Sequence, residues 1–221
     1  MDALLEGGLY SGELIELEGE VASGKTQICL AAAATTAMNG HRVLYIDTSG
    51  SFCPNRILGL TGLDADEELD PAQIEFLSLI AVKEVFDIHG LVELLDSTYH
   101  TFVSSSDPSV HLPHLIIVDS LAAVAQPALS SQHAQGHALL SYVGRILGRI
   151  AHECALATMV TNFTLPNRQD GAAKPALGVS WSGVPSTRLW FRRDPSAEGL
   201  IDVTIVKSNR LAVGLNTALF L

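Results

Sequence analysis

Short apolar runs recur along the chain, and the segments between them have apolar residues at helical spacing. Residues 13–18 (ELIELE) alternate between apolar and charged positions, as a strand with one buried face does. Residues 42–47 (RVLYID) and 114–120 (HLIIVDS) are nearly continuous apolar runs, which is typical of strands buried on both faces. With two further runs, the pattern predicts strands at 13–18, 42–47, 74–80, 114–120 and 156–162.

The segments between these strands are predicted to be helices. Residues 25–39 are rich in alanine and lack glycine and proline, and Gly40 follows as a stop signal. Further helices are predicted at 55–62, 86–102 and 133–152, with an acidic surface loop at 64–71. A long segment containing glycine and proline, 163–185, leads to three strand-like pieces, TRLWFRR, LIDVTIVK and TALFL.

This order of elements predicts an α/β fold. Strands that alternate with helices favour a mostly parallel, twisted sheet covered by helices on both faces. The three strands that arrive together at the end predict an antiparallel extension of one sheet edge. In such sheets ligands collect at the carboxyl ends of the strands, so candidate chemistry is expected there.

A glycine-rich loop lies between the first strand and the first helix. It reads GEVASGKTQ, with Gly19, Gly24, Lys25 and Thr26 at the four fixed positions of a phosphate-binding loop. Its glycines allow backbone N–H groups to point at phosphates, and the helix that follows adds partial positive charge. Lys25 would contact the β- and γ-phosphates of ATP, and the Thr26 hydroxyl would coordinate Mg²⁺. The predicted nucleotide-binding residues are Gly19, Glu20, Val21, Ala22, Ser23, Gly24, Lys25, Thr26 and Gln27.

A second candidate residue follows the strand at 114–120. Asp119 ends an apolar run, where its carboxylate would hold a water molecule of the Mg²⁺ shell. An aspartate at the end of a buried strand also has an ordinary role in turns. The glycine-rich loop favours the metal-binding interpretation, which makes Thr26 and Asp119 the predicted metal residues.

Composition and charge narrow the class of protein. The chain has 221 residues, of which 48% are hydrophobic, and this size fits one domain with a substantial core. No apolar run is long enough for a membrane helix, and three cysteines without close spacing predict neither a disulfide scaffold nor a zinc cluster. The net charge is −11, but residues 1–143 carry four Lys/Arg against 19 Asp/Glu and residues 144–221 carry nine against five. The mildly basic last third could meet a phosphate backbone, or its charge could be uneven solvated surface.

With these motifs placed, the whole chain resembles the ATPase core of the eukaryotic RecA-like recombinases. GEVASGKTQ, LYIDTSGSFCPNRI, LIIVDS and MVTN occur in that family's order, and KPALGVSWSGVPSTR (174–188) resembles the D-type branch of its paralogues. The resemblance implies a RecA-like P-loop NTPase core over residues 1–221, without the family's helical N-terminal domain, in a trimmed chain or a short isoform. It also implies a nuclear role in homologous-recombination repair, beside the C-type paralogue and the short X-ray-repair paralogue.

Two departures from the family pattern concern ATP hydrolysis. Active recombinases carry a glutamate that orients the attacking water where this chain has Ser49, and a glutamine near the γ-phosphate where it has Phe163. A serine hydroxyl without an activating neighbour is not a base near neutral pH. Asp47 or Glu20 could substitute for the missing glutamate. We therefore expect ATP and Mg²⁺ to bind and hydrolysis to be slow at best.

Two loops of the resembled family face DNA. The first corresponds to 125–140 and holds no lysine or arginine, and the second corresponds to 162–183. Few cations predict weak binding of single-stranded or branched DNA. Phe163 and Trp181 could stack on bases or pack into the protein. The DNA-facing candidates are Phe163, Arg168, Lys174 and Trp181.

Three functions remain open from the sequence. The leading hypothesis is an ATP-binding accessory subunit of homologous-recombination repair. The second is a DNA-stimulated ATPase that uses Asp47 or Glu20, and the third is a protein scaffold that does not need nucleotide.

Overall fold

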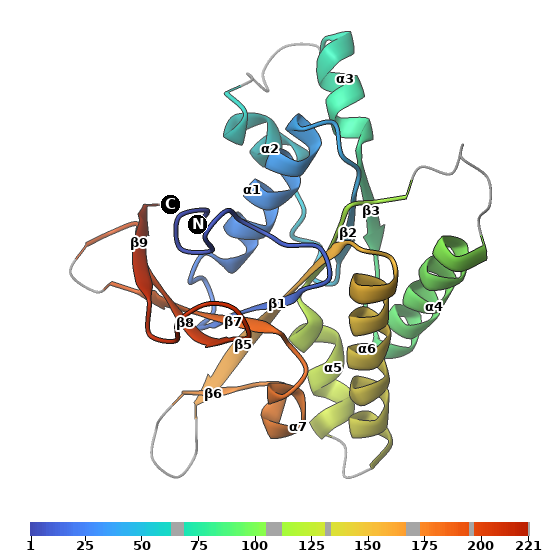
Figure 1. Ribbon diagram of the computed structural model, residues 1–221, viewed down its shortest axis with the longest axis vertical. Helices are drawn as coiled ribbons and strands as arrows, with labels where there is room; N and C mark the ends of the chain where they lie inside the picture. Colours follow the sequence, from blue (N-terminus) through green and yellow to red (C-terminus); the bar gives the residue numbers. More distant parts are fainter. Residues whose placement is uncertain (63–68, 105–111, 131–133, 167–172, 195–196, 221) are drawn as a thin grey trace.

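The computed structural model describes residues 1–62, 69–104, 112–130, 134–166, 173–194 and 197–220 (Figure 1). Within these residues a nine-stranded sheet runs through the molecule in the order β3-β2-β4-β5-β1-β7-β8-β9, with β6 paired to β5. The strands are β1 (Leu14–Gly19), β2 (Val43–Asp47), β3 (Ile80–Glu84), β4 (Leu115–Asp119), β5 (Ala157–Pro166), β6 (Ala173–Pro175), β7 (Thr187–Arg193), β8 (Leu200–Ser208) and β9 (Asn216–Phe220).

The sheet is parallel from β3 to β7 and antiparallel beyond it. β1 lies between β5 and β7 and is parallel to both, while β7, β8 and β9 form an antiparallel series at one edge. This confirms the α/β fold class and the antiparallel extension expected from the last three apolar runs.

Helices cover both faces of the sheet. They are α1 (Lys25–Met38), α2 (Pro54–Leu60), α3 (Pro71–Ser78), α4 (Ile88–Ser104), α5 (Leu121–Ser130), α6 (Ala134–Glu153) and α7 (Gly178–Ser182). In Figure 1, α1, α2 and α3 lie on one side of the sheet and α4, α5 and α6 on the other. No helix among the described residues is long and apolar enough to cross a membrane.

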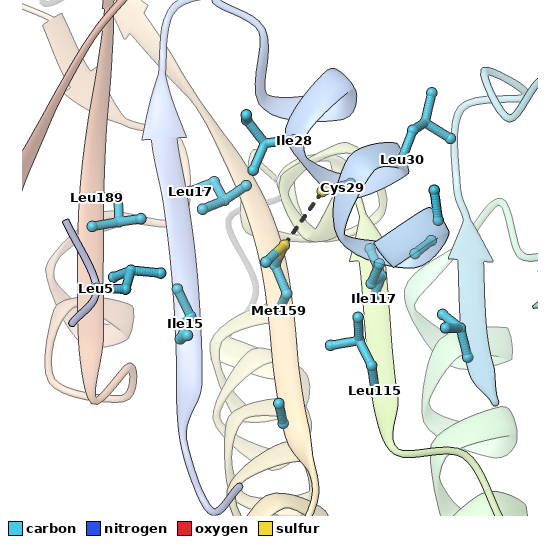
Figure 2. Packing of buried hydrophobic residues seen from close by; sticks show 14 of the residues in the cluster. Leu5, Ile15, Leu17, Ile28, Cys29, Leu30, Leu115, Ile117, Met159 and Leu189 are labelled. Atoms are coloured by element: carbon cyan, nitrogen blue, oxygen red, sulfur yellow. Dashed lines mark hydrogen bonds between the residues drawn. The ribbon is translucent and has the colours of Figure 1, made fainter. Parts of the chain in front are cut away.

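Each face has its own hydrophobic core, because alternate side chains of β1 point in opposite directions. Ile15 and Leu17 pack with α1 and the N-terminal segment, and Figure 2 shows the Cys29 thiol of α1 directed at the Met159 sulfur of β5. On the other face Leu14 belongs to the core beneath α4, α5 and α6. The remaining β1 residues on that second face are Glu16 and Glu18, and both are buried.

The prediction of a strand at 74–80 is wrong. Residues Pro71–Ser78 form helix α3, and the strand begins at Ile80. The reason is a capping box that the apolar run concealed: the Asp70 carboxylate accepts from the Gln73 N–H at 2.8 Å, and the Gln73 side chain accepts from the Asp70 N–H at 2.9 Å. Two backbone donors are satisfied only if the chain turns into a helix there.

Replacing Asp70 by alanine is expected to destabilise α3 by about 1 kcal/mol, because the cap of the helix is lost. Amide hydrogen exchange of residues 71–78 measures this as faster exchange than in the unmodified protein. The control is Asp70→Asn, which keeps an acceptor at the cap and should restore protection. Equal exchange rates in Asp70→Ala and the unmodified protein would contradict the role of the capping box.

The segment expected to be the first DNA-facing loop, 125–140, is largely helical. Residues up to Ser130 belong to α5, which tolerates Pro127 in its interior, and Ala134 begins α6. Between them, 131–133 lies outside the described residues. The helix prediction at 133–152 is confirmed as α6, whereas α5 was not predicted.

Candidate nucleotide-binding site

The carboxyl ends of four parallel strands bring the predicted motifs together. Gly19 at the end of β1 is paired in register with Phe163 of β5, and Asp47 at the end of β2 is paired with Asp119 of β4. The sequence placed these residues at strand ends, and the parallel register places the strand ends side by side.

The phosphate loop has the backbone that its glycines allow. A Cβ atom on Gly19 would lie 2.2 Å from the carbonyl oxygen of Phe191, so only glycine fits between β1 and β7. Gly24, immediately before α1, has φ 87°, a left-handed conformation that side chains rarely adopt. The loop therefore returns to the start of α1, and residues 22–27 line a hollow at the N-terminus of this helix.

Lys25 is folded back onto the loop. Its ammonium donates to the carbonyl oxygens of Gly19 at 3.0 Å and Glu20 at 2.6 Å, and to the Ser23 hydroxyl at 3.2 Å. Burial lowers its pKa from 10.5 to about 8, against the opposing attraction of the Asp119 carboxylate. A buried ammonium held by neutral carbonyls gains when a phosphate takes their place, because its charge is then paired.

Asp119 is positioned by two buried hydroxyls. Thr161 of β5 donates to its Oδ1 at 2.6 Å, and Tyr45 of β2 donates to its Oδ2 at 2.9 Å. Burial, with the neighbouring Cys29 and Asp119, raises the pKa of Tyr45, so the phenol stays a donor. The carboxylate is 3% exposed and acts electrostatically on Lys25. It is thus fixed beside the phosphate loop, where a metal-bound water would need an acceptor.

The end of β2 shows what Asp47 does in this structure. Its Oδ1 accepts from the Ser49 N–H at 3.0 Å and its Oδ2 from the Phe52 N–H at 2.8 Å. Burial alone would raise the pKa of Asp47, but the backbone N–H groups of Phe52 and Ser49 outweigh it and the pKa is lowered. A carboxylate with a lowered pKa is a weaker base, so this environment opposes the general-base role. Glu20 is exposed on the phosphate loop.

A hollow of about 310 Å³ opens over the loop, lined by 22–27 and by Arg56 of α2. The sequence analysis missed Arg56, which belongs to no local motif and reaches the loop because α2 folds back against α1. With its oxygen turned toward Arg56, the Gln27 amide accepts from the guanidinium. A second hollow of about 650 Å³ continues from Ala22, Gly24, Gln27 and Arg56 to the β7–β8 hairpin. The two hollows share a wall and give room for the rest of a nucleotide.

These residues fit ATP with Mg²⁺. Nothing but glycine fits at position 19. Among the described residues, the buried Lys25 ammonium has no charged partner within hydrogen-bond distance. The Asp119 carboxylate is held in place by the Thr161 hydroxyl. Lys25 and the loop amides would hold the phosphates, while Thr26 and Asp119 would hold the metal and its water. Mg²⁺ would supply charge neutralisation at the β- and γ-phosphates.

The described DNA-facing candidates differ in their exposure. Lys174 is exposed on β6, whereas Phe163 is half-buried on β5 and packs against the core beneath α5 and α6. Trp181 is 1% exposed and its indole N–H donates to Glu16. Of the two predicted roles, stacking on bases or packing into the protein, the structure shows packing. Arg168 lies outside the described residues.

The buried acidic pair of β1 has an electrostatic cost. Glu18 lies 3.2 Å from the Arg188 guanidinium, which Glu16 also contacts. Burial and the Glu16 charge raise the pKa of Glu18 from 4.5 to about 7, despite the opposing effect of Arg188. The folded chain therefore binds this proton more tightly than the unfolded chain does.

The stability contributed by the protonated form should be complete below pH 4.5 and lost as the pH rises through 7, on the order of 3 kcal/mol at about 1.4 kcal/mol per pKa unit. We expect Glu18→Gln to raise the unfolding free energy at pH 8 and to flatten its decline between pH 5 and 8. Urea unfolding across this range measures it. Glu84→Gln, on the exposed edge strand β3, is the control and should keep the decline. A Glu18→Gln protein with the unmodified pH profile would show that Glu18 does not titrate in this range.

The chain is similar to known proteins in sequence and in structure. The sequence profile of the Rad51 family matches residues 1–205. The chain is 37% identical over 219 residues to DNA repair protein RAD51 homolog 4 of Bos taurus, and 38% over 220 residues to that of Mus musculus. These alignments cover 97% of this chain and 66% of each relative, so the chain spans about two thirds of their length. The crystal structure of the RadB recombinase superposes with a TM-score of 0.76 at 25% identity, covering 98% of this chain and 90% of that chain.

Proposed function

This chain belongs to the Rad51 family, and we propose that it is an ATP-binding accessory subunit of homologous-recombination DNA repair. In this proposal Mg²⁺–ATP binds at the phosphate loop and hydrolysis is slow at best. The nucleotide sets the shape of surfaces that dock other recombinase paralogues and bind single-stranded or branched DNA weakly.

One observation supports the proposal most strongly. The phosphate-loop motif has all its residues, whereas the end of β2, beside it, lacks a carboxylate that is free to act as a general base. Lys25 and Thr26 after β1, and Asp119 at the end of β4, support the binding of nucleotide and metal. At the end of β2, by contrast, Ser49 has no carboxylate, and Asp47 is bonded to the N–H groups of its own turn. Losing a positioned base commonly slows a reaction by about two to four orders of magnitude. Binding without rapid turnover is therefore the function that this geometry supports best.

The repair role rests on the relatives. The mammalian relatives are DNA repair proteins, and the chain is homologous to them over nearly its whole length. From these relatives we infer that the protein acts in the nucleus. We expect its partners to be the C-type and the short X-ray-repair paralogues. The sequence between β5 and β7 carries two cations, Arg168 and Lys174, which supports weak rather than tight DNA binding.

The test is a titration of ATP with Mg²⁺ in which melting temperature and phosphate release are read together, with and without single-stranded DNA. We expect a rise in melting temperature at saturation, since a ligand that binds only the folded state stabilises it. Phosphate release should stay well below one turnover per second, which is at the low end for enzymes. Several turnovers per second would contradict the accessory role, and no rise in melting temperature would favour the nucleotide-independent scaffold.

A second candidate function is favoured by one observation, the exposure of Glu20 on the phosphate loop. A DNA-stimulated ATPase that uses this carboxylate would lose its turnover in Glu20→Gln while retaining the ATP-induced rise in melting temperature. If phosphate release is the same in Glu20→Gln and the unmodified protein, Glu20 is not the base.

A further inference from the structure

A single buried carboxylate joins the strand of the phosphate loop to the helix that ends the segment between β5 and β7. Glu16 of β1 is 0% exposed. Its Oε1 accepts from the Asn162 side-chain amide at 2.7 Å and from the Trp181 indole N–H at 3.0 Å. Its Oε2 accepts from the Arg188 guanidinium at 2.6 Å. We call these residues, with Glu18, the Glu16 network.

The members of the Glu16 network come from four elements around the candidate site. Glu16 lies three residues before Gly19, on the strand that becomes the phosphate loop. Asn162 precedes Phe163, which is paired in register with Gly19. Trp181 lies on α7, and Arg188 lies on β7, directly opposite Glu16. A displacement of β1 near the loop therefore acts on α7 through a direct hydrogen bond.

Helix α7 depends on few contacts for its position. Trp181 is its buried residue and packs against α6, where a Cβ atom on Gly144 would lie 3.1 Å from the indole ring. At its end the Lys207 ammonium donates to the carbonyl oxygens of Ser182 at 3.1 Å and Gly183 at 3.0 Å. On the outer side Val179 is 89% exposed. Because α7 has five residues and a single buried side chain, a displacement of the Trp181 indole displaces the helix.

The Glu16 network is incompletely satisfied. Asn162 Oδ1 and Arg188 Nη2 are buried, and neither has a hydrogen-bond partner among the residues that the structure describes. Arg188 is also shared, since its Nε lies 2.6 Å from Glu16 and 3.2 Å from Glu18. Buried polar groups are rarely left unpaired, so these two atoms would gain from a rearrangement of the Glu16 network that gave them partners.

Nucleotide binding would disturb this balance at one end. The Lys25 ammonium bonds to the carbonyl oxygens of Gly19 and Glu20, the two residues after Glu18. When phosphate takes the ammonium, those carbonyls lose their donor and the end of β1 can relax. The distance between Glu18 and the Arg188 guanidinium would then change, and with it the hydrogen bond from the Trp181 indole to Glu16.

We propose that Glu16 is a positioning residue that couples the phosphate loop to α7, so that nucleotide binding shifts Trp181 and α7. This inference rests on the proposed function, because it requires that ATP binds. Coupling between two sites is reciprocal. Whatever docks on or near α7 and displaces Trp181 must therefore change ATP affinity by the same factor.

Tryptophan fluorescence tests the proposal. The chain has two tryptophans, Trp181 and Trp190, so Trp190→Phe leaves Trp181 as the reporter. In this variant saturating Mg²⁺–ATP should change the emission of Trp181. Adding Glu16→Gln places an amide against Arg188 and should abolish this response, while the Kd for ATP, from calorimetry, stays within about threefold. The matched control is Glu153→Gln on the exposed face of α6, which should keep the response.

A second variant covers the case in which Glu16→Gln does not fold. Trp181→Phe keeps a smaller aromatic side chain at this position and removes the N–H donor to Glu16. Amide hydrogen exchange of residues 177–184 should slow or quicken on ATP binding in the unmodified protein and should not respond in Trp181→Phe. A Trp181 emission or α7 exchange that stays constant while calorimetry shows bound ATP would overturn the coupling alone. If calorimetry shows no ATP binding to the unmodified protein, the proposed function and the coupling both fail.

Discussion

Replacing Lys25 by alanine is expected to weaken Mg²⁺–ATP binding by about 100-fold, because a charge-assisted contact to phosphate is worth roughly 1.5–3 kcal/mol. The ammonium is the buried cation of the phosphate loop, and its hydrogen bonds to Gly19 and Glu20 show that it is within reach of the hollow. Calorimetric titration measures the change directly.

The ligand-free Lys25→Ala protein should be nearly as stable as the unmodified one. Burial of the Lys25 ammonium is unfavourable, as its pKa of about 8 indicates, so its removal takes away a cost together with its hydrogen bonds. The rise in melting temperature on adding ATP should nevertheless be lost. Lys83→Ala, at an exposed position on β3, is the control and should bind ATP normally. An unchanged Kd in Lys25→Ala would mean that ATP does not bind at this loop.

Replacing Gly19 by alanine is expected to cost about 3 kcal/mol of unfolding free energy or more, since overpacking against backbone cannot be relieved by a side-chain rotation. The added Cβ would lie 2.2 Å from the Phe191 carbonyl oxygen and 3.0 Å from the Ser23 hydroxyl. Relief requires that β1 and β7 separate where they are paired. Urea unfolding measures the loss.

The matched control is Gly148→Ala on α6, where an added Cβ meets nothing within 4 Å. That change should be neutral or stabilising by about 0.5–1 kcal/mol, because alanine is the better helix former. If both variants unfold at the same urea concentration, β1 and β7 do not approach each other as closely as described.

Gly19→Ala and Lys25→Ala test two different requirements of the phosphate loop. Gly19 allows β1 to approach β7 where the loop begins, whereas Lys25 is expected to give the loop its affinity for phosphate. A protein that serves only as a scaffold would still need Gly19 for its fold, but it would not need Lys25. Comparing complex formation with paralogues in Lys25→Ala and in Gly148→Ala therefore distinguishes a nucleotide-dependent subunit from a scaffold.

Local patterns predicted much of the fold. The phosphate loop, α1 and most strands were placed correctly, because each depends on neighbouring residues: glycines where the backbone needs them, alanines in a helix, apolar runs in buried strands. The exception at 74–80 was local too, since the capping box of Asp70 and Gln73 was visible in the sequence and outweighed the apolar run. Helix α5 was missed because the family resemblance favoured a loop at 125–140.

The sequence by itself predicted a phosphate loop in an α/β core, and the resemblance to the recombinases implied that Ser49 stands where active members carry a glutamate. Only the tertiary structure decided that Arg56 reaches the hollow over the phosphate loop, and that Trp181 is buried with its indole N–H bonded to Glu16. The reason is the range of the interactions. The phosphate loop is a conformation of consecutive residues, whereas Glu16 meets Asn162, Trp181 and Arg188 across 146, 165 and 172 residues of chain. Such contacts follow from the register of the sheet, which no local pattern in the sequence contains.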